Sequence, residues 1–196
     1  EIGKDAFSGC DALREVTLPP GLTRIGDYAF GNCGALSFVA LPSGLTSIGE
    51  HAFFGCSSLT AVTLPEGLLS IEAGAFASCP SLTAVTLPAS LTALGANPFQ
   101  NAEKLMIDVS PRNDTFACLR GVLFDKKEGR LITYPAALTD ARYAAPQGTK
   151  IIGENAFAGC GALTAITLPK GLTDIEAYAF AECDALTAIS LPEGLA

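Results

Sequence analysis

Residues 47–68, SIGEHAFFGCSSLTAVTLPEGL, form one copy of a pattern that recurs along the chain. An Ala-Phe pair, a cysteine three residues after the Phe, a leucine three residues after the cysteine and a later proline return together at a spacing of 23 residues. A fixed spacing of this kind is the sequence signature of repeat proteins. The recurring aromatic and cysteine positions are Phe7, Phe30, Phe53, Phe76, Phe99, Phe157 and Phe180, and Cys10, Cys33, Cys56, Cys79, Cys160 and Cys183.

Each part of the pattern has a structural reason. In LTAVTLP, residues 82–88, Val85 and Leu87 fall on one face of a short strand, and Ala84 and Thr86 fall on the other. The Pro-x-Gly that follows suits a tight turn with Pro at its second position and Gly at its fourth. The segment AFxxC is too short for an α-helix and favours a single 3₁₀-like turn. Because a 23-residue unit cannot bury its own apolar face, whereas stacked units bury one another's, the pattern predicts a solenoid.

The strand motif LxxVxLP is typical of leucine-rich repeats. The complete pattern, with its I-G and A-F-x-x-C elements, closely resembles the BspA-like (Treponema pallidum type) bacterial leucine-rich repeat family over nearly all 196 residues. The resemblance implies a right-handed solenoid, α/β by convention but rich in β-structure, with a parallel sheet on the concave side and little regular helix. We expect a single leucine-rich-repeat domain over residues 1–196. Its eight concave strands are expected near residues 14–18, 37–41, 60–64, 83–87, 105–109, 141–145, 164–168 and 187–191.

One coil is irregular. Between Pro111 and Pro146 the proline spacing is 35 residues instead of 23. The intervening GVLFDKKEGRLITY predicts an inserted β-hairpin with strands at 121–125 and 130–134, and Gly129 is placed to adopt a positive φ in its turn. Irregular coils with hairpins also occur in the family that the chain resembles. We therefore interpret residues 111–146 as a variation within the solenoid and not as a domain boundary.

The cysteine column allows three interpretations. Coils stacked about 4.8 Å apart would bring successive cysteines within reach of disulfides, and thiolates also bind Zn²⁺. However, these side chains point the same way into a packed core, and a linear column does not converge on one ion. We expect reduced, buried thiols that behave as small apolar residues, and we expect no metal or other cofactor. Cys118 lies outside the column and is expected to be the most exposed and reactive thiol.

His51, the only histidine, precedes Cys56 by five residues. A catalytic Cys–His pair needs the two side chains within hydrogen-bonding reach, but Cys56 is expected to point inward and His51 outward. Asp125 and Glu128 flank the hairpin turn without the alternating run of oxygen ligands of a Ca²⁺ loop, so turn capping explains them. The chain also lacks P-loop, nucleophile-elbow and HExxH motifs, and we expect it not to be an enzyme. The positions aligned with His51 are Asp5, Tyr28, Gly74, Asn97, Asn155 and Tyr178.

Charge and hydropathy exclude two classes of partner. The formal charge is −8 and the 12 basic residues are scattered, which argues against nucleic acid because phosphate binding depends on clustered Lys and Arg. No apolar run approaches the roughly 18 residues that span a bilayer, so no membrane-spanning segment is expected. The chain begins and stops in mid-repeat, and we expect it to be a segment of a longer protein.

The outward-facing residues of the concave strands form a smooth stripe of Ala and Thr with one aromatic side chain. Such a stripe could be a docking face, because solenoids bind partners on their concave surface. Alternatively, it reflects only the ordinary preference of Thr for exposed strands. The candidate binding residues are Glu15, Thr17, Phe38, Ala61, Thr63, Ala84, Thr86, Thr167 and Ser190, with Ala40, Ala165 and Ala188 in the same two columns.

These observations favour a non-catalytic protein-interaction or adhesion module with a protein or glycan ligand. The family resemblance implies a secreted bacterial protein, displayed at the cell surface or extracellular, that binds host, matrix or other surface ligands. The alternative is a spacer, or a substrate-positioning arm, of a larger protein whose active domain lies outside this segment.

Overall fold

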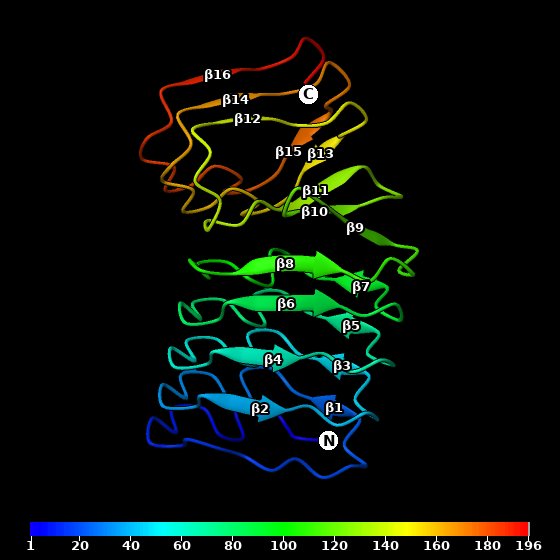
Figure 1. Cartoon of the computed structure of the whole chain (residues 1–196), viewed down its shortest axis with the longest axis vertical. Coiled ribbons are helices and arrows are strands. Elements are labelled where there is room, and N and C mark those ends of the chain that lie inside the picture. Colours follow the sequence, from blue (N-terminus) through cyan, green and yellow to red (C-terminus); the bar gives the residue numbers. More distant parts are fainter. Residues whose placement is uncertain (196) are drawn as a thin grey trace.

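The computed structural model describes residues 1–195, which wind into a stack of short-stranded coils and contain no helix (Figure 1). Strands on one side of the stack belong to what we call the strand face, the side that the sequence analysis placed on the concave surface. They are β2 (Phe38–Ala40), β4 (Ala61–Thr63), β6 (Ala84–Leu87), β8 (Met106–Val109), β12 (Arg142–Ala144), β14 (Ala165–Thr167) and β16 (Ala188–Ser190).

A second set of shorter strands lies on another side of the coils. These strands pair in parallel in the orders β1-β3-β5-β7 and β11-β13-β15, whereas the strand-face pairs are β2-β4, β6-β8 and β12-β14-β16. The two-residue strands of this set are β1 (Arg24–Ile25), β3 (Ser47–Ile48), β5 (Ser70–Ile71), β7 (Ala93–Leu94), β13 (Ile151–Ile152) and β15 (Asp174–Ile175), and β11 (Arg130–Thr133) has four residues.

Seven of the eight expected concave strands are present, and the one expected at residues 14–18 is not. This first coil has a neighbouring coil on one side only within the described residues. Its contacts toward that neighbour include a hydrogen bond from Ser37 N–H to Arg14 C=O (3.3 Å). A parallel strand is defined by a regular ladder to its neighbour, and residues 14–18 form no such ladder with β2.

Successive coils are joined by backbone hydrogen bonds at the repeat spacing. Phe30 N–H donates to Ala52 C=O, and Phe53 N–H donates to Ala75 C=O, each at 2.8 Å. The Phe30 and Phe53 rings stack with centroids 5.3 Å apart, and both side chains are fully buried. Full burial of a Phe side chain contributes about 1.5–3 kcal/mol, so the aromatic column is a principal source of stability.

The two predicted turns have different outcomes. In the AFxxC segment, Ala29 N–H donates to Gly26 C=O (3.2 Å) and Cys33 N–H donates to Phe30 C=O (3.3 Å), which confirms hydrogen bonding of the 3₁₀ type. The Pro-x-Gly turn lies one residue later than predicted. Leu45 N–H donates to Pro42 C=O (3.0 Å), so Pro is the first residue of the turn and Gly the third.

Each regular coil requires a left-handed backbone conformation at two positions. His51 has φ 53° and Gly55 has φ 69°, and positive φ recurs at aligned positions in other coils. Left-handed φ favours Gly and tolerates Asn and Asp, which explains why these residues are frequent in both columns. The positive-φ residues are Asp5, Tyr28, His51, Gly74, Asn155 and Tyr178 in one column, and Gly9, Asn32, Gly55, Ser78, Asn101, Gly159 and Glu182 in the other.

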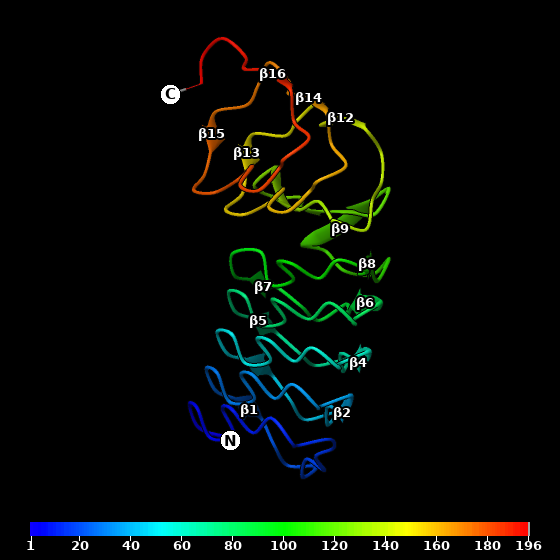
Figure 2. The same ribbon diagram turned by 90° about the vertical axis from the view of Figure 1, so that its left-hand side faces the viewer.

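The irregular coil contains a three-stranded antiparallel meander and not only a hairpin. The predicted strands are present as β10 (Val122–Asp125) and β11 (Arg130–Thr133), and Gly129 has the predicted positive φ, 66°. A further strand, β9 (Phe116–Leu119), pairs with β10 and was not predicted. Figure 2 shows β9 crossing between the coils of β1–β8 and those of β12–β16.

The meander is a layer that belongs to two cores. Leu123 and Ile132 pack into the core of the N-terminal coils, whereas their neighbours Val122 and Leu131 pack into the core of the C-terminal coils. Strands buried on both faces are apolar without alternation, which explains the runs VLF at residues 122–124 and LI at residues 131–132. The irregular coil therefore separates two stacks of coils and connects them through shared packing.

The repeat resumes at Tyr134, earlier than the sequence analysis recognised. Tyr134 N–H donates to Ala156 C=O (2.8 Å), and its ring stacks on Phe157 with centroids 5.1 Å apart. Tyr134 therefore occupies the position that Phe holds in the regular coils. Beside it, buried Asn97 links the two stacks by accepting a hydrogen bond from the Thr133 hydroxyl (2.9 Å) and donating to Asn155 C=O (2.7 Å).

Four of the six column cysteines, Cys33, Cys56, Cys79 and Cys160, are buried in the core as predicted. The Cys56 thiol donates to Phe30 C=O and the Cys79 thiol to Phe53 C=O, both at 3.2 Å. Burial raises the pKa of Cys79 to about 12, which keeps this thiol protonated and unreactive at neutral pH. All seven thiols are free in the structure: Cys10, Cys33, Cys56, Cys79, Cys118, Cys160 and Cys183.

The prediction about the most exposed thiol was wrong. Cys118 is half-buried in β9, its thiol donates to Ile107 C=O (3.1 Å), and burial raises its pKa. Cys10, in the first coil, is the exposed cysteine, because within the described residues no preceding coil covers it.

Replacing Gly55 with Ala tests the left-handed position. An added Cβ would lie 2.5 Å from Asn32 Oδ1 while φ is 69°, so we expect the free energy of unfolding to fall by about 1–2 kcal/mol in urea denaturation. Gly161→Ala is the matched control, since its Cβ meets nothing within 4 Å, and it should change stability by less than about 0.5 kcal/mol. Equal effects of the two substitutions would contradict this interpretation.

The buried thiols predict loss of stability at alkaline pH. The folded state keeps Cys79 protonated where the unfolded chain ionises it, because its pKa rises from 9.0 to about 12 on folding. The stabilisation is complete below about pH 9 and is lost as pH rises, by up to about 1.4 kcal/mol per pH unit for each thiol. Cys79→Ala should reduce the slope of unfolding free energy against pH between about 9 and 10.5. Ala102 already occupies the aligned core position in another coil, so the fold accommodates Ala there. An unchanged slope would refute the explanation.

Candidate functional site

The strand face brings most of the predicted binding residues together. Phe38 aligns with Ala61, and Ala40 aligns with Thr63, in the register of β2 and β4. Phe38 is 53% exposed, although aromatic side chains usually bury much of their surface. The exposed predicted residues in this surface are Phe38, Ala61, Thr63, Ala84, Thr86, Thr167 and Ser190. Glu15 and Thr17 are also exposed, but they lie in the first coil, where the expected strand is absent.

Four residues of this face were missed by the sequence analysis. Met106 and Asp108 of β8 align with Ala84 and Thr86, and they continue the two columns. Arg142 and Ala144 of β12 continue them in the C-terminal stack, where they align with Ala165 and Thr167. The alternation in MID and RYA is the sequence signal for these four residues, but neither segment belongs to a regular coil.

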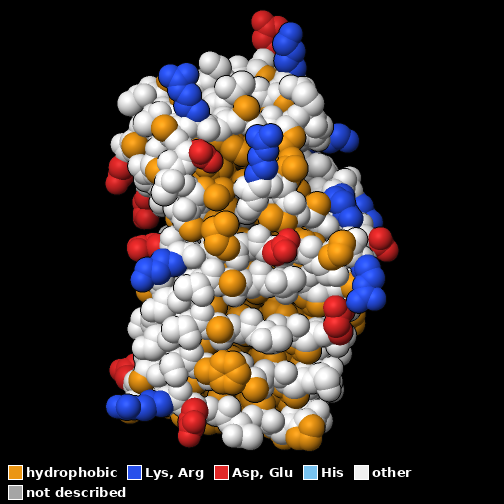
Figure 3. All heavy atoms as spheres, in the orientation of Figure 1, with side chains coloured by type: hydrophobic (Ala, Val, Ile, Leu, Met, Phe, Trp, Pro, Cys, Tyr) orange, Lys and Arg blue, Asp and Glu red, His pale blue; other side chains and the backbone are white. Residues whose placement is uncertain are grey.

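The face is smooth and poor in charge over its N-terminal half. Figure 3 shows that charged side chains lie mainly at the margins of the lower part, and that its centre consists of apolar and uncharged polar groups. Met106 is 49% exposed, so two large apolar side chains, Phe38 and Met106, project from an otherwise small-featured surface. Exposed aromatic and Met side chains are enriched at protein interfaces.

A shallow hollow of about 440 Å³ lies at one end of these strands. It is lined by Thr63 and Thr86 together with Glu66, Pro88 and Pro111. Small side chains at this place leave room for a partner to approach the sheet closely. Its position at the ends of β4 and β6 connects the hollow with the strand face.

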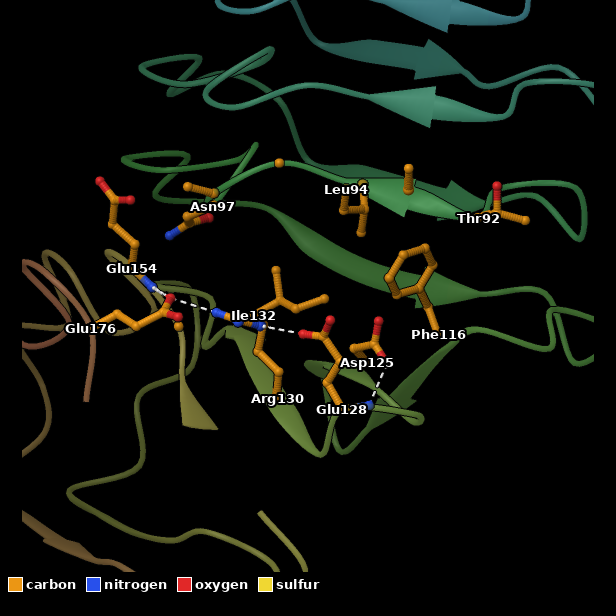
Figure 4. Close-up of a pocket in the computed structure, with 14 residues that line it drawn as sticks. Thr92, Leu94, Asn97, Phe116, Asp125, Glu128, Arg130, Ile132, Glu154 and Glu176 are labelled. Atoms are coloured by element: carbon orange, nitrogen blue, oxygen red, sulfur yellow. Dashed lines mark hydrogen bonds and ion pairs between the residues drawn. The ribbon is translucent and has the colours of Figure 1, made fainter. Parts of the chain in front are cut away.

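A second hollow, of about 290 Å³, carries an acidic cluster between β7 and β11 (Figure 4). Arg130 forms ion pairs with Glu128 (2.8 Å) and Glu176, and hydrogen bonding to Glu176 raises the pKa of the guanidinium. Glu176 also accepts a hydrogen bond from Glu154 N–H (3.0 Å). These contacts tie β11 to the coils of β13 and β15. Within residues 1–195, no group of three or more His, Cys, Asp or Glu is arranged to hold a metal ion.

His51 does not form a site with Cys56. Its ring stacks on Tyr28 with centroids 4.9 Å apart and meets the edge of Phe54, while the Cys56 thiol donates to Phe30 C=O. The His51 side chain is 27% exposed and stacks on Tyr28, so the predicted outward position is only partly correct. Tyr28 and His51 are aligned in successive coils, and their rings pack on one another along the solenoid.

The described part of the chain has no helix of the length and hydropathy needed to cross a bilayer.

Comparisons with known proteins agree with this architecture. The sequence matches the BspA type leucine rich repeat region, in six copies, over residues 1–106 and 141–196. The unmatched residues between them hold most of the irregular coil. A search of curated proteins finds no match.

Several solved structures share the fold. The pneumococcal vaccine antigen PcpA is 36% identical with a TM-score of 0.82, over 89% of this chain and 44% of that one. A leucine rich cell surface protein of Faecalibacterium prausnitzii is 27% identical with a TM-score of 0.74, over 99% of this chain and 65% of that one. The T. pallidum leucine-rich repeat protein is 28% identical with a TM-score of 0.52, over 91% and 70%. This chain spans less than two thirds of the first two structures. The chain belongs to the BspA-type leucine-rich repeat family.

Proposed function

We propose that this chain is a non-catalytic adhesion module that binds a protein ligand through the strand face. The observation that carries the proposal is the exposure of Phe38 and Met106 on the strand face, whose strands are hydrogen-bonded to neighbouring coils and carry few charges over the N-terminal half. A rigid face loses little conformational entropy on binding, and exposed apolar side chains then contribute by being buried against the partner. Membership of the leucine-rich repeat family supports a protein-interaction module.

The proposed location is the bacterial cell surface or the extracellular space. Two structural neighbours support it, because one is described as a vaccine antigen and the other as a cell surface protein. Host or matrix proteins are the ligands that we propose for this surface.

The double substitution Thr63→Arg with Thr86→Arg tests the strand face. Both residues are exposed, so we expect an unchanged melting temperature, while two long cations in the hollow should prevent close approach of a partner. Binding is measured by biolayer interferometry against immobilised fibronectin, laminin and collagen, and any affinity of the native chain should fall at least tenfold.

Ser8→Arg with Thr23→Arg is the matched control, because it adds the same charge at exposed positions outside the strand face. We expect this control to bind like the native chain. Loss of binding in both double variants, or in neither, would exclude the strand face as the docking surface.

A further inference from the structure

Tyr134 is an exception in the aromatic column. The corresponding position is Phe in the seven other coils: Phe7, Phe30, Phe53, Phe76, Phe99, Phe157 and Phe180. Tyr134 is buried, and its hydroxyl has no hydrogen-bond partner among the described residues. A buried hydroxyl without a partner destabilises the folded state, whereas Phe would fill the position without this penalty. The hydroxyl therefore calls for an explanation other than folding.

Tyr134 is among the residues that line a cavity of about 550 Å³ at the break between the two stacks. The strand face is interrupted here, because β8 and β12 neither pair nor lie in contact, whereas β4 and β6, which also do not pair, are adjacent. Aliphatic side chains line much of the cavity: Val122 is buried, Leu138 is half-buried, and Leu119 is 49% exposed. The volume suits one or two side chains of a bound peptide.

The rim of this cavity carries two arginines without ion-pair partners. Arg120, in the turn between β9 and β10, and Arg142 of β12 are both exposed, and neither forms a salt bridge within residues 1–195. Asp140 is the single acid in the lining. Although the chain has a formal charge of −8, these two guanidinium groups create a local positive charge. Such a pair attracts a carboxylate, which Arg binds well.

The Tyr134 hydroxyl is available as a donor. Burial, with a smaller effect of Asp140, raises its pKa to about 12, so it remains protonated at neutral pH. The hydroxyl is shielded from solvent and Tyr143 packs edge-on against the Tyr134 ring, so a ligand group reaches the hydroxyl only after neighbouring side chains move aside.

We propose that this cavity binds an acidic peptide segment of a protein partner. An aliphatic side chain of the peptide packs on Leu119 and Leu138, and its carboxylate pairs with Arg120 and Arg142. A peptide carbonyl accepts the hydrogen bond of the Tyr134 hydroxyl. The inference rests on the proposed function only in that the partner is a protein. Arg142 belongs to β12 and lines the cavity, so the cavity lies at the edge of the strand face.

The aromatic geometry favours a peptide over a glycan. Sugar rings stack on free aromatic faces, but Tyr134 and Tyr143 pack against each other edge-on, with centroids 4.9 Å apart, and both contact Phe157. Phe157 therefore covers one face of the Tyr134 ring, and the edge-on contact of Tyr134 with Tyr143 reduces the free aromatic surface further. Aliphatic lining with two arginines matches a peptide that carries both Leu and Glu.

The test uses fluorescein-labelled Glu-Leu-Glu-Leu and its neutral isostere Gln-Leu-Gln-Leu, titrated with the intact chain in fluorescence anisotropy. We expect the acidic peptide to bind at least tenfold more tightly than the neutral one. Tyr134→Phe should preserve or raise the melting temperature. It should also lower the affinity for the acidic peptide by about 2- to 10-fold, which is the effect of losing one hydrogen bond. Arg120→Asn with Arg142→Gln should abolish the preference for the acidic peptide, and Asn suits Arg120 because φ is 53° there.

Tyr28→Phe is the control, because it removes a tyrosine hydroxyl outside the cavity and should leave the peptide affinity unchanged. Thr63→Arg with Thr86→Arg should also retain peptide binding, so failure of the strand-face proposal and failure of the cavity proposal can be distinguished. Equal affinity for the two peptides, or a Tyr134→Phe variant that melts lower and binds equally well, would overturn the proposal. Binding of heparin oligosaccharide with no binding of the acidic peptide would overturn it in favour of a glycan.

Discussion

The fold depends on the hydrogen bond from a core Phe N–H to the Ala C=O that lies 22 residues further on, in the next coil. Phe30 and Phe53 make this bond at 2.8 Å, and the thiols of Cys56 and Cys79 bond back to the same two Phe residues. Buried backbone groups must find partners, and outside the local turns each coil finds them in its neighbours. The spacing of 23 residues is therefore a requirement of hydrogen bonding as well as of packing.

The irregular coil shows how this requirement is met when the repeat is interrupted. The strands β10 and β11 supply apolar side chains to the cores on both sides, and β11 also pairs with β13. Beyond them, Tyr134 restores the regular hydrogen bond to Ala156. The interruption opens the strand-face sheet and leaves a cavity there, so the feature that departs from the repeat is also the one with distinctive chemistry. We propose that residues 1–196 nevertheless form one domain, because the meander is part of both cores.

The repeated features could be predicted well from the sequence, because each position can be compared with the aligned positions of the other coils. It placed the cysteine column in the core and the strands of the hairpin to within a residue. It missed β9, because FACL has no counterpart in another coil, and it missed the resumption of the repeat at Tyr134, because Ala137 stands where the cysteine would follow. The packing of His51 was missed because it depends on Tyr28, one coil earlier. The cavity depends on how the meander separates the stacks, which no local pattern encodes.

Native-state hydrogen exchange, read by mass spectrometry, tests the central claim that the meander joins two stacks into one domain. If it does, amides of residues 116–133 should be protected as strongly as those of the regular coils around Phe53 and Phe157, and protection should decline only toward the terminal coils. Rapid exchange throughout residues 116–133, with strong protection on either side, would contradict the claim and would show two independent stacks.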